Sequence, residues 1–260
     1  MTEPHVVPKA RIISGKPPEL IVYDEQQPCP YLNGRVAELP LRIPARRLER
    51  DEFDERLENG DRRQGIFLYR TACPSCNACE PIRIEVDQFE PSRSQRRAWA
   101  RGNHEITTEI GEPIADEERV SLYNRHKQLR GLSGGREDID LRGYREFLVM
   151  TCCETIELRY HAHGRLIGIA LADRGERGLS AVYCFYDPAA ESLGVGTYSI
   201  LKQIELCKNW RIKYLYLGLY IAECTKMAYK AHFLPHERLV DGAWQRVEGS
   251  RAGRSPEGGR

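Results

Sequence analysis

Leu179-Ser-Ala-Val-Tyr-Cys-Phe-Tyr186 is a short apolar run typical of a strand, and Tyr214-Leu-Tyr-Leu-Gly-Leu219 is a second. Between them lies Gly196 to Trp210, where apolar residues recur at roughly helical spacing, namely Ile200, Leu201, Ile204 and Leu206. Two further strand-like runs, Glu154 to Tyr160 and Leu166 to Ala172, come before this unit. A strand meander followed by a helix and another strand predicts an α+β fold for the second half of the chain.

The first half of the chain predicts shorter elements. Arg46 to Asn59 has apolar residues at helical spacing and stops at a Gly-Asp pair, which indicates a short helix. Gly65 to Arg70 and Pro81 to Val86 are typical of strands, with a cysteine-rich loop between them. Asp116 to Leu132 and Leu141 to Met150 favour helices. We therefore expect a flexible leader (1–18), a smaller N-terminal α+β domain (19–110), a C-terminal domain (111–247) and a disordered tail (248–260).

The charge balance limits how the protein can contact nucleic acid. The 260 residues include 39 Lys and Arg against 38 Asp and Glu, a formal charge of +1. Proteins that coat nucleic acid are usually more basic, so any RNA contact must come from a local patch. No run approaches the ~20 apolar residues of a membrane helix, and Met1 to Lys16 has no apolar core of the signal-peptide kind. We expect a cytoplasmic monomer without a membrane partner.

Cys73-Pro-Ser-Cys-Asn-Ala-Cys79 is the most distinctive local motif. Two overlapping Cys-x-x-Cys units place three thiols on one tight loop, where they can converge on a metal ion or cluster. Zinc and iron–sulfur clusters both take four ligands, so Cys29 in another short loop is the candidate fourth. The candidate ligands of zinc or an iron–sulfur cluster are therefore Cys29, Cys73, Cys76 and Cys79. A redox switch and a purely structural turn remain alternatives.

Ser92 to Gly102 is a basic segment with an indole in it. Guanidinium groups hold phosphates and an indole stacks on unpaired bases, which together suit the ends and loops of RNA. The candidate tRNA contacts are Arg93, Arg96, Arg97, Trp99 and Arg101. A solvated helix face is the alternative interpretation.

Three other positions carry side chains suited to a reaction site. Arg83, alone in a strand, is a candidate for holding a carboxylate bidentately. Asp187 follows a predicted strand and can polarise an amine nucleophile, although Asp187-Pro188 can equally be only a turn. Tyr186 belongs to a tyrosine-rich region whose phenols offer flat apolar area for an adenosine ring or a peptide.

Taken together, these motifs resemble the arginyl/leucyl-tRNA–protein transferase family, and most closely its short bacterial branch, the aspartate/glutamate leucyltransferases. The resemblance runs from about Leu20 to Trp244. It is carried by Tyr23-Asp24, Pro28-Cys-Pro-Tyr-Leu32, Gly34-Arg35, Leu39-Pro-Leu-Arg42, Gly60-Asp-Arg-Arg63, Leu68-Tyr-Arg-Thr71, Cys73 to Arg83, Pro91 to Arg97, Phe185-Tyr-Asp-Pro188, Ser192-Leu193, Gly196-Thr-Tyr-Ser199, Tyr214 to Gly218, Lys226-Met227 and Tyr229-Lys230.

The resemblance implies a fold and an activity. The C-terminal domain is expected to be GNAT-like (acyl-CoA N-acyltransferase-like), consistent with the α+β pattern. The implied reaction joins leucine, or alternatively arginine, from its charged tRNA to the N-terminal Asp or Glu of acceptor proteins, marking them for degradation by the N-degron pathway. No cofactor is required for it. Relatives of the eukaryotic type bind an iron–sulfur cluster through N-terminal cysteines; this chain does not reproduce their spacing.

Within this reaction, the candidate residues take specific roles. Asp187 and Tyr186 are the catalytic candidates, with Asp187 accepting the last proton of the amine. A fixed cation must hold the acceptor's acidic side chain, for which we expect Arg83, with Arg70 or Lys230 as substitutes.

Two other functional classes compete with this interpretation. An acetyl-CoA-dependent GNAT N-acetyltransferase would have a Gly-rich pyrophosphate loop, and Glu191-Ser-Leu-Gly-Val-Gly196 matches its glycines but not the Arg or Gln that starts it. A non-catalytic RNA- or metal-binding module would leave the transferase-like second half unexplained.

Overall fold

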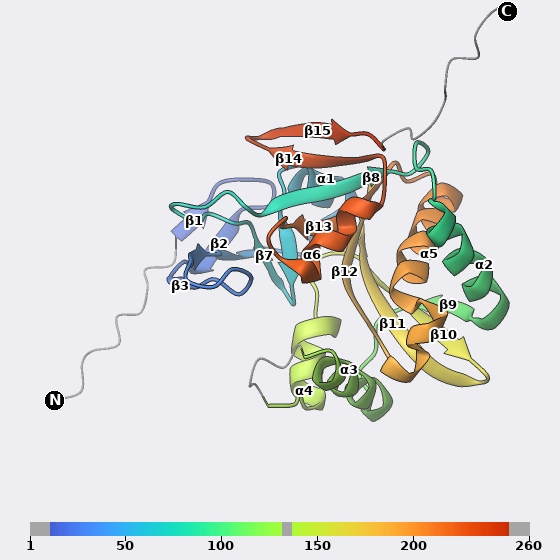
Figure 1. Ribbon diagram of the computed structural model, residues 1–260. Helices are drawn as coiled ribbons and strands as arrows, with labels where there is room; N and C mark the ends of the chain where they lie inside the picture. Colours follow the sequence, from blue (N-terminus) through green and yellow to red (C-terminus); the bar gives the residue numbers. More distant parts are fainter. Residues whose placement is uncertain (1–10, 132–136, 250–260) are drawn as a thin grey trace, which may run out of the picture.

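The computed structural model describes residues 11–131 and 137–249 (Figure 1). Within these residues a large mixed sheet has the strand order β15-β14-β8-β13-β12-β11-β10-β9. Its strands are β8 (Glu80–Glu85), β9 (Thr107–Gly111), β10 (Thr155–Ala162), β11 (Arg165–Arg174), β12 (Gly178–Tyr186), β13 (Tyr214–Tyr220), β14 (His236–Val240) and β15 (Ala243–Val247). Every neighbouring pair in this sheet is antiparallel except β12 and β13, which are parallel.

Helices pack on both faces of the large sheet. Successive side chains of β12 point to opposite faces, so neighbouring residues of this strand belong to different cores. Cys184 and Tyr186 face the core shared with α5 (Val195–Trp210), on which α2 (Arg93–Glu105) packs. Tyr183 and Phe185 face the second core, formed with α3 (Glu117–Leu129), α4 (Leu141–Tyr144) and the π-helical turn η1 (Arg145–Val149). The sheet is thus the middle layer of three.

The close packing of α2 on α5 depends on Gly102. A β-carbon at position 102 would overlap the ring of Tyr198, which is buried and also packs against Trp99 at 5.6 Å between ring centroids. Only glycine leaves room for this ring between the two helices. The contact fixes the basic helix α2 beside the large sheet.

A smaller sheet from the N-terminal part of the chain has the order β1-β2-β5-β7-β6. Its strands are β1 (Arg11–Ile13), β2 (Glu19–Tyr23), β5 (Leu41–Pro44), β6 (Arg62–Gln64) and β7 (Phe67–Tyr69), and a hairpin of β3 (Gln26–Pro28) and β4 (Val36–Glu38) accompanies it. Helix α1 (Arg50–Glu58) packs nearby, with Phe53 and Leu57 in a third core that includes Tyr216 of β13.

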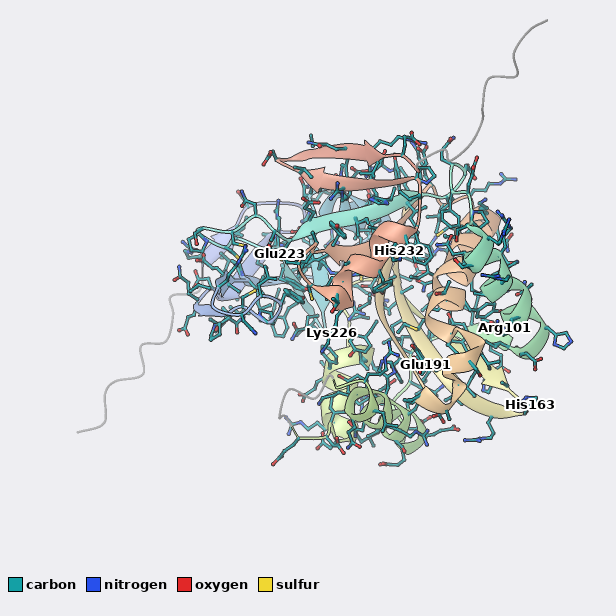
Figure 2. The ribbon with its side chains drawn as sticks, viewed as in Figure 1. Arg101, His163, Glu191, Glu223, Lys226 and His232 are labelled. Carbon is teal, nitrogen blue, oxygen red and sulfur yellow. The ribbon has the colours of Figure 1, made fainter. Side chains whose placement is uncertain are left out.

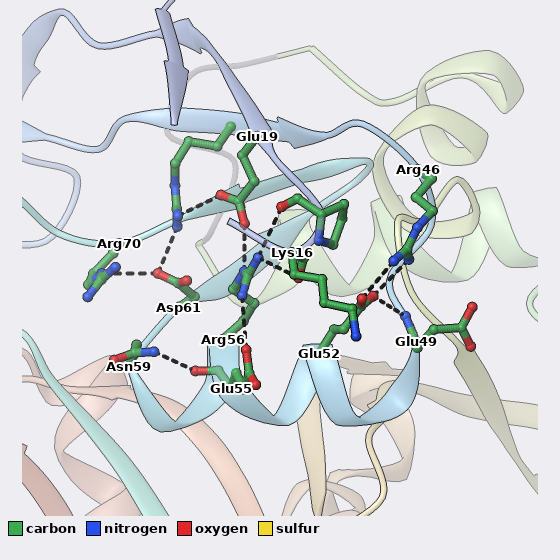
Figure 3. A network of polar contacts seen from close by, with 12 residues as sticks. Lys16, Glu19, Arg46, Glu49, Glu52, Glu55, Arg56, Asn59, Asp61 and Arg70 are labelled. Atoms are coloured by element: carbon green, nitrogen blue, oxygen red, sulfur yellow. Dashed lines mark hydrogen bonds and ion pairs between the residues drawn. The ribbon is translucent and has the colours of Figure 1, made fainter. Parts of the chain in front are cut away.

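Buried ion pairs hold the smaller sheet to α1 (Figure 3). Arg42 of β5 donates to Glu19 of β2 at 2.8 Å and to Asp61 at 2.7 Å. Arg56 of α1 donates to the other oxygen of Glu19 at 2.6 Å. Because Glu19 and Asp61 are buried, removing one partner would leave a buried charge uncompensated. The network therefore fixes where β6, which follows Asp61, begins.

The predicted elements of the second half are confirmed, and the α+β class with them. One expectation for the chain ends needs correction. Residues 11–13, placed in the flexible leader, form β1 and pair with β2, while residues 1–10 and 250–260 lie outside the described parts. The hairpin β14–β15 was not anticipated. The division at residue 110 stays a prediction, and β8, α2 and β9, all before or at it, pack with the C-terminal strands.

Candidate active site

The site is built where β12 and β13 diverge. The two parallel strands pair only from Gly178 to Ser180 with Tyr214 to Tyr216, and each then continues to its carboxyl end. Ligand sites of open sheets containing parallel strands commonly form where neighbouring strands separate. Side chains from β6, β12 and the short helix η3 (Tyr229–His232) meet at this place. We call this set the divergence cluster: Arg62, Cys184, Tyr186, Tyr229 and Lys230.

The buried side chain of Lys230 is anchored to β13. Its Nζ donates to the carbonyl of Leu219 at 2.6 Å and contacts the sulfur of Met227 at 3.2 Å. Burial, together with the positive charge of Arg62, lowers the pKa of Lys230 to about 7. An ammonium group loses its hydration on burial without gaining a carboxylate here, so the neutral amine is favoured.

Arg62 reaches the cluster from the edge strand of the smaller sheet. Its guanidinium lies against Gly218 of β13, where a β-carbon would overlap Nη1 and Cζ. Gly218 has a positive φ of 88° and sits at a register irregularity between β13 and β8. Among the described residues, no side-chain hydrogen bond or ion pair engages this guanidinium. Arg62 is half-buried, which makes a cation without a carboxylate notable.

The two tyrosines of the cluster come from different elements, Tyr186 from β12 and Tyr229 from η3. Tyr229 remains 46% exposed, and partial desolvation raises the pKa of its phenol, with Cys184 and Tyr186 of β12 adding to the rise and Arg62 opposing it. Tyr186 packs edge-on against His126 of α3 at 4.9 Å between ring centroids, and burial raises its pKa as well. The cluster therefore links β12 to η3 across the space between the two strands.

Polar side chains surround the end of β12. Arg130, at the end of α3, pairs with Glu191 at 2.8 Å and lies 5.7 Å from the centre of the Tyr186 ring. Lys226 of α6 (Thr225–Ala228) donates to the carbonyl of Gly131 at 3.2 Å, which brings α6 to the end of α3. Figure 2 labels Lys226 and Glu191 at this place. These contacts bring the end of α3, η2 (Pro188–Leu193) and α6 together beside the cluster.

Comparison with known proteins gives the family. The family description "Arginine-tRNA-protein transferase, N terminus" matches residues 27–97, and its counterpart "C terminus" matches residues 118–240. The chain belongs to the arginine-tRNA–protein transferase family. The resemblance inferred from the motifs is confirmed, and with it the class of enzyme.

Relatives of this transferase match it over most of their length. The aspartate/glutamate leucyltransferase of Chromobacterium violaceum is 39% identical over 84% of this chain and 90% of its own. That of Methylobacillus flagellatus is 36% identical over 86% of this chain and 90% of its own. A crystal structure of FemX is similar at a TM-score of 0.44 with 8% identity, covering 80% of this chain and 79% of that one.

The predicted carboxylate-binding arginines of the transferase are already engaged. Arg83 donates to Glu237 at 2.6 Å, pairs with Glu58 at 3.0 Å and donates to the hydroxyl of Tyr216 at 3.0 Å. Its guanidinium also lies between the rings of Tyr214 and Trp244, at 3.8 and 4.0 Å from their centres. These contacts hold β8, β13, β14, β15 and α1 together.

Arg70, the other substitute, is also paired within the protein. It follows β7 and pairs with Asp61 at 3.0 Å, with half of its side chain exposed (Figure 3). The structure thus joins Lys230 and Tyr186 in the divergence cluster and leaves Arg83 and Arg70 outside it. Their substrate roles remain predictions.

Asp187 lies at the end of β12, beside Tyr186. Its carboxylate caps the short helix η2 (Pro188–Leu193) by accepting from the backbone N–H of Ala189 at 3.0 Å. Arg125 and Arg165 approach it at 3.6 and 3.9 Å. The turn and the functional interpretations are therefore compatible, because Oδ1 caps the turn while Oδ2 faces the two arginines.

The basic residues of α2 divide into two kinds. Arg93, Arg96, Arg97 and Arg101 are exposed, whereas Trp99 is half-buried against Tyr198. Arg101 donates to the carbonyl of Ser192 in η2, which ties this end of the helix to the loop after Asp187. The arginines are placed to meet phosphates, but the indole is committed to the packing of α2 on α5.

The cysteines of the predicted metal site lie near one another. Burial raises the pKa of Cys79 to about 12, and Cys73, Cys29, Cys76 and Cys224 add to this rise from nearby. Within residues 11–131 and 137–249, no group of three or more His, Cys, Asp or Glu side chains is arranged to hold a metal ion. The donor set suits zinc or an iron–sulfur cluster but its arrangement does not, so metal binding stays a prediction.

Sequence reasoning gave no role to three members of the cluster, Arg62, Cys184 and Tyr229. Arg62 and Tyr229 lie in motifs that carry the family resemblance, Gly60-Asp-Arg-Arg63 and Tyr229-Lys230. The available signal was thus their position in a motif, and no feature of the motif distinguishes Arg62 from Arg63. In the structure Arg63 is fully buried and donates to Asp173 at 2.6 Å, whereas Arg62 has no such partner among the described residues.

Proposed function

We propose that this transferase conjugates leucine from leucyl-tRNA to the α-amine of an N-terminal Asp or Glu, at the divergence cluster. The names of the relatives support the donor and the acceptor. The observation that carries the placement is the convergence of Arg62 and Lys230 at the end of β13, with no carboxylate paired to either among the described residues. An acidic acceptor supplies the negative charge that the guanidinium of Arg62 lacks within the described residues.

The proposed chemistry is aminolysis of an activated ester. The acceptor's amine attacks the aminoacyl carbonyl, the carbon–oxygen bond to the terminal ribose breaks, and a peptide bond forms. Positioning the amine about 3 Å from the carbonyl supplies much of the rate enhancement. The amine must be neutral to attack, and an α-amine with a pKa of ~7.7–8.0 is partly neutral near pH 7.

Asp187 is the proposed acceptor of the last proton of this amine, with Tyr186 beside it in the site. The carboxylate lies at the end of β12, with Arg125 and Arg165 at 3.6 and 3.9 Å from it. Geometry of this kind, a buried carboxylate next to a reaction site, is what general-base catalysis requires.

The proposed tRNA contacts are the exposed arginines of α2. They hold phosphates in a way that does not depend on base sequence. Because Arg101 touches the loop after Asp187, the same helix can guide the aminoacylated end toward the cluster. We further propose that the larger sheet with α2 and α5 is GNAT-like, and that the protein acts as a cytoplasmic monomer whose products enter the N-degron pathway.

One observation favours a second candidate, the acetyl-CoA-dependent N-acetyltransferase. Helix α5 comes after β12 and the short helix η2, and its N-cap residue Gly194 makes no side-chain hydrogen bond. Free backbone N–H groups at a helix start can hold a pyrophosphate. A thioester donor and a charged tRNA are distinguished directly by which one supplies the acyl group.

The test uses purified protein, labelled leucine on tRNA, labelled acetyl-CoA, and peptides that differ in their first residue. Label should pass from leucyl-tRNA to peptides starting with Asp or Glu, and much less to those starting with Asn or Ala. Transfer from arginyl-tRNA instead would change the donor and leave the acceptor proposal standing. Acylation from the thioester alone would establish the second candidate.

A further inference from the structure

Most arginine side chains near the two sheets are neutralised within the protein. Arg42, Arg63 and Arg83 each donate to a buried or partly buried carboxylate. Arg62, one residue from Arg63, differs from them. Among the described residues its guanidinium has no carboxylate within 4.0 Å, although it is half-buried.

The surroundings of Arg62 are built to receive an anion. Tyr31, Tyr229 and Lys230 lie close enough for the charge of Arg62 to act on the pKa of each, lowering it in every case. Two phenol groups can donate hydrogen bonds to a bound carboxylate, and Gly218 leaves the guanidinium room against β13. The set offers positive charge and donors, and it contains no competing carboxylate.

We propose that Arg62 is the residue that holds the side-chain carboxylate of the acceptor's N-terminal Asp or Glu. This inference rests on the proposed function and replaces the sequence-based choice of Arg83. A planar guanidinium binds a carboxylate with two parallel hydrogen bonds and carries its charge at every working pH. Lys230, with Nζ committed to the carbonyl of Leu219, is a weaker choice for the same role.

Selectivity follows from the same contact. An Asn or Gln side chain has the shape of the acid but lacks the charge, so it leaves the half-buried guanidinium uncompensated. Truncating one partner of a desolvated charge pair commonly weakens binding by more than 30-fold, and we expect a wild-type preference for Asp over Asn of about 100-fold in kcat/KM. The preference thus depends on a single side chain.

The experiment compares the Asp-to-Asn preference in wild type, Arg62→Gln and Arg62→Lys, using leucyl-tRNA and peptides that differ in the first residue alone. Arg62→Gln should lower kcat/KM for the Asp peptide about 100-fold and leave the Asn peptide within about threefold, because only the acid contacts the charge. Arg62→Lys should keep part of the preference, since it retains the charge but loses the planar fork. An equal loss of kcat/KM for the Asp and the Asn peptide in Arg62→Gln would indicate a damaged fold, and that result would overturn the proposal.

Two further arms make the outcome decisive. Arg70→Gln and Arg83→Met should keep the wild-type preference, and collapse of the preference in either with Arg62→Gln unaffected would assign the contact elsewhere. The exposed Arg142, paired with Glu146 on the surface, provides the control for basal activity as Arg142→Gln. Binding of a C-terminally labelled Asp peptide, measured by fluorescence anisotropy without tRNA, tests Arg62 even if transfer fails. Binding to wild type and not to Arg62→Gln supports the contact; equal binding to both refutes it.

Discussion

The guanidinium of Arg62 lies directly against the backbone of Gly218, although the two residues come from different sheets. Position 218 has no side chain and a φ of 88°, which an L residue rarely adopts. The irregular register between β13 and β8 at this glycine gives the arginine its place at the end of β13. A local backbone feature of one sheet therefore positions a charged group delivered by the other.

Replacing Gly218 with alanine should displace Arg62. The new β-carbon would overlap the guanidinium, and the positive φ would add about 1–3 kcal/mol of strain. Gly164→Ala is a matched control, because Gly164 has a φ of 73° and nothing within 4 Å of the added carbon. Both variants should lose stability in urea titrations, but only Gly218→Ala should lose transfer to Asp peptides. Similar kinetics in the two variants would argue against the contact.

Lys230 should make stability depend on pH above neutrality. Its pKa is about 7 in the folded protein against 10.5 in an ordinary lysine. Between these values the unfolded chain binds a proton that the folded one does not, so the free energy of unfolding rises with pH by about 1.4 kcal/mol per unit. Below about pH 7 both states are protonated, and the penalty of burying the charge is then complete.

Urea denaturation of wild type and Lys230→Met at about pH 7.5 and 9.5 measures this effect. Wild type should gain stability relative to Lys230→Met as the pH rises, because methionine has no proton to release. Lys208→Met provides the control, because Lys208 is exposed. Its free energy of unfolding should change between the two pH values by the same amount as that of wild type. A constant difference between wild type and Lys230→Met across this range would mean that Lys230 titrates normally.

The sequence predicted those parts of the fold in which one segment carries its own periodic pattern. β12, α5 and β13 were located because their apolar spacing is set by a single buried face. The hairpin β14–β15 was missed, since His236-Glu-Arg-Leu-Val240 is mostly polar and only half-buried. β1 was missed for a related reason: its three residues are exposed and are ordered by pairing with β2.

The candidate site also depends on contacts that a local stretch of sequence does not reveal. Arg83 was chosen because a single arginine stands in an apolar strand, but its partner Glu237 lies 154 residues away in the chain. Nothing local to Arg62, Arg63 or Arg83 tells which guanidinium is neutralised, because that depends on contacts between distant segments. Lys230 and Tyr186 were predicted, whereas the unpaired Arg62 emerges only when the two sheets are placed together.

Arg83→Met should act on stability and not on substrate choice. It removes contacts to Glu58, Glu237 and Tyr216 and leaves two partly buried carboxylates without their cation. Breaking such a pair costs about 3 kcal/mol, and methionine keeps much of the packing between Tyr214 and Trp244. Thermal and urea unfolding would measure the loss, while kcat/KM should change equally for Asp and Asn peptides. A loss confined to the Asp peptide would restore Arg83 as the acceptor-binding residue.

The two kinds of α2 residue should respond differently to substitution. Arg93→Gln with Arg97→Gln should weaken tRNA binding and reduce the slope of log affinity against log salt by about 2, since each phosphate contact contributes about 1. Trp99→Phe should leave tRNA affinity unchanged and lower stability, because the indole packs on Tyr198. Filter binding across salt concentrations separates these outcomes. A Trp99→Phe protein that is stable but binds tRNA poorly would return the indole to a stacking role.

Asp187→Asn isolates the charge at the end of β12 from its structural role. Asparagine can still accept the hydrogen bond from Ala189, so η2 should keep its cap. The ion pairs with Arg125 and Arg165 are long and their arginines are mostly exposed, so their loss should cost well under about 1 kcal/mol. Transfer should slow most at low pH, where fewer acceptor amines are already neutral and a carboxylate is needed most. Rates measured from about pH 6 to 9 should therefore diverge from wild type toward the acid end, and profiles that stay parallel would assign Asp187 to the turn alone.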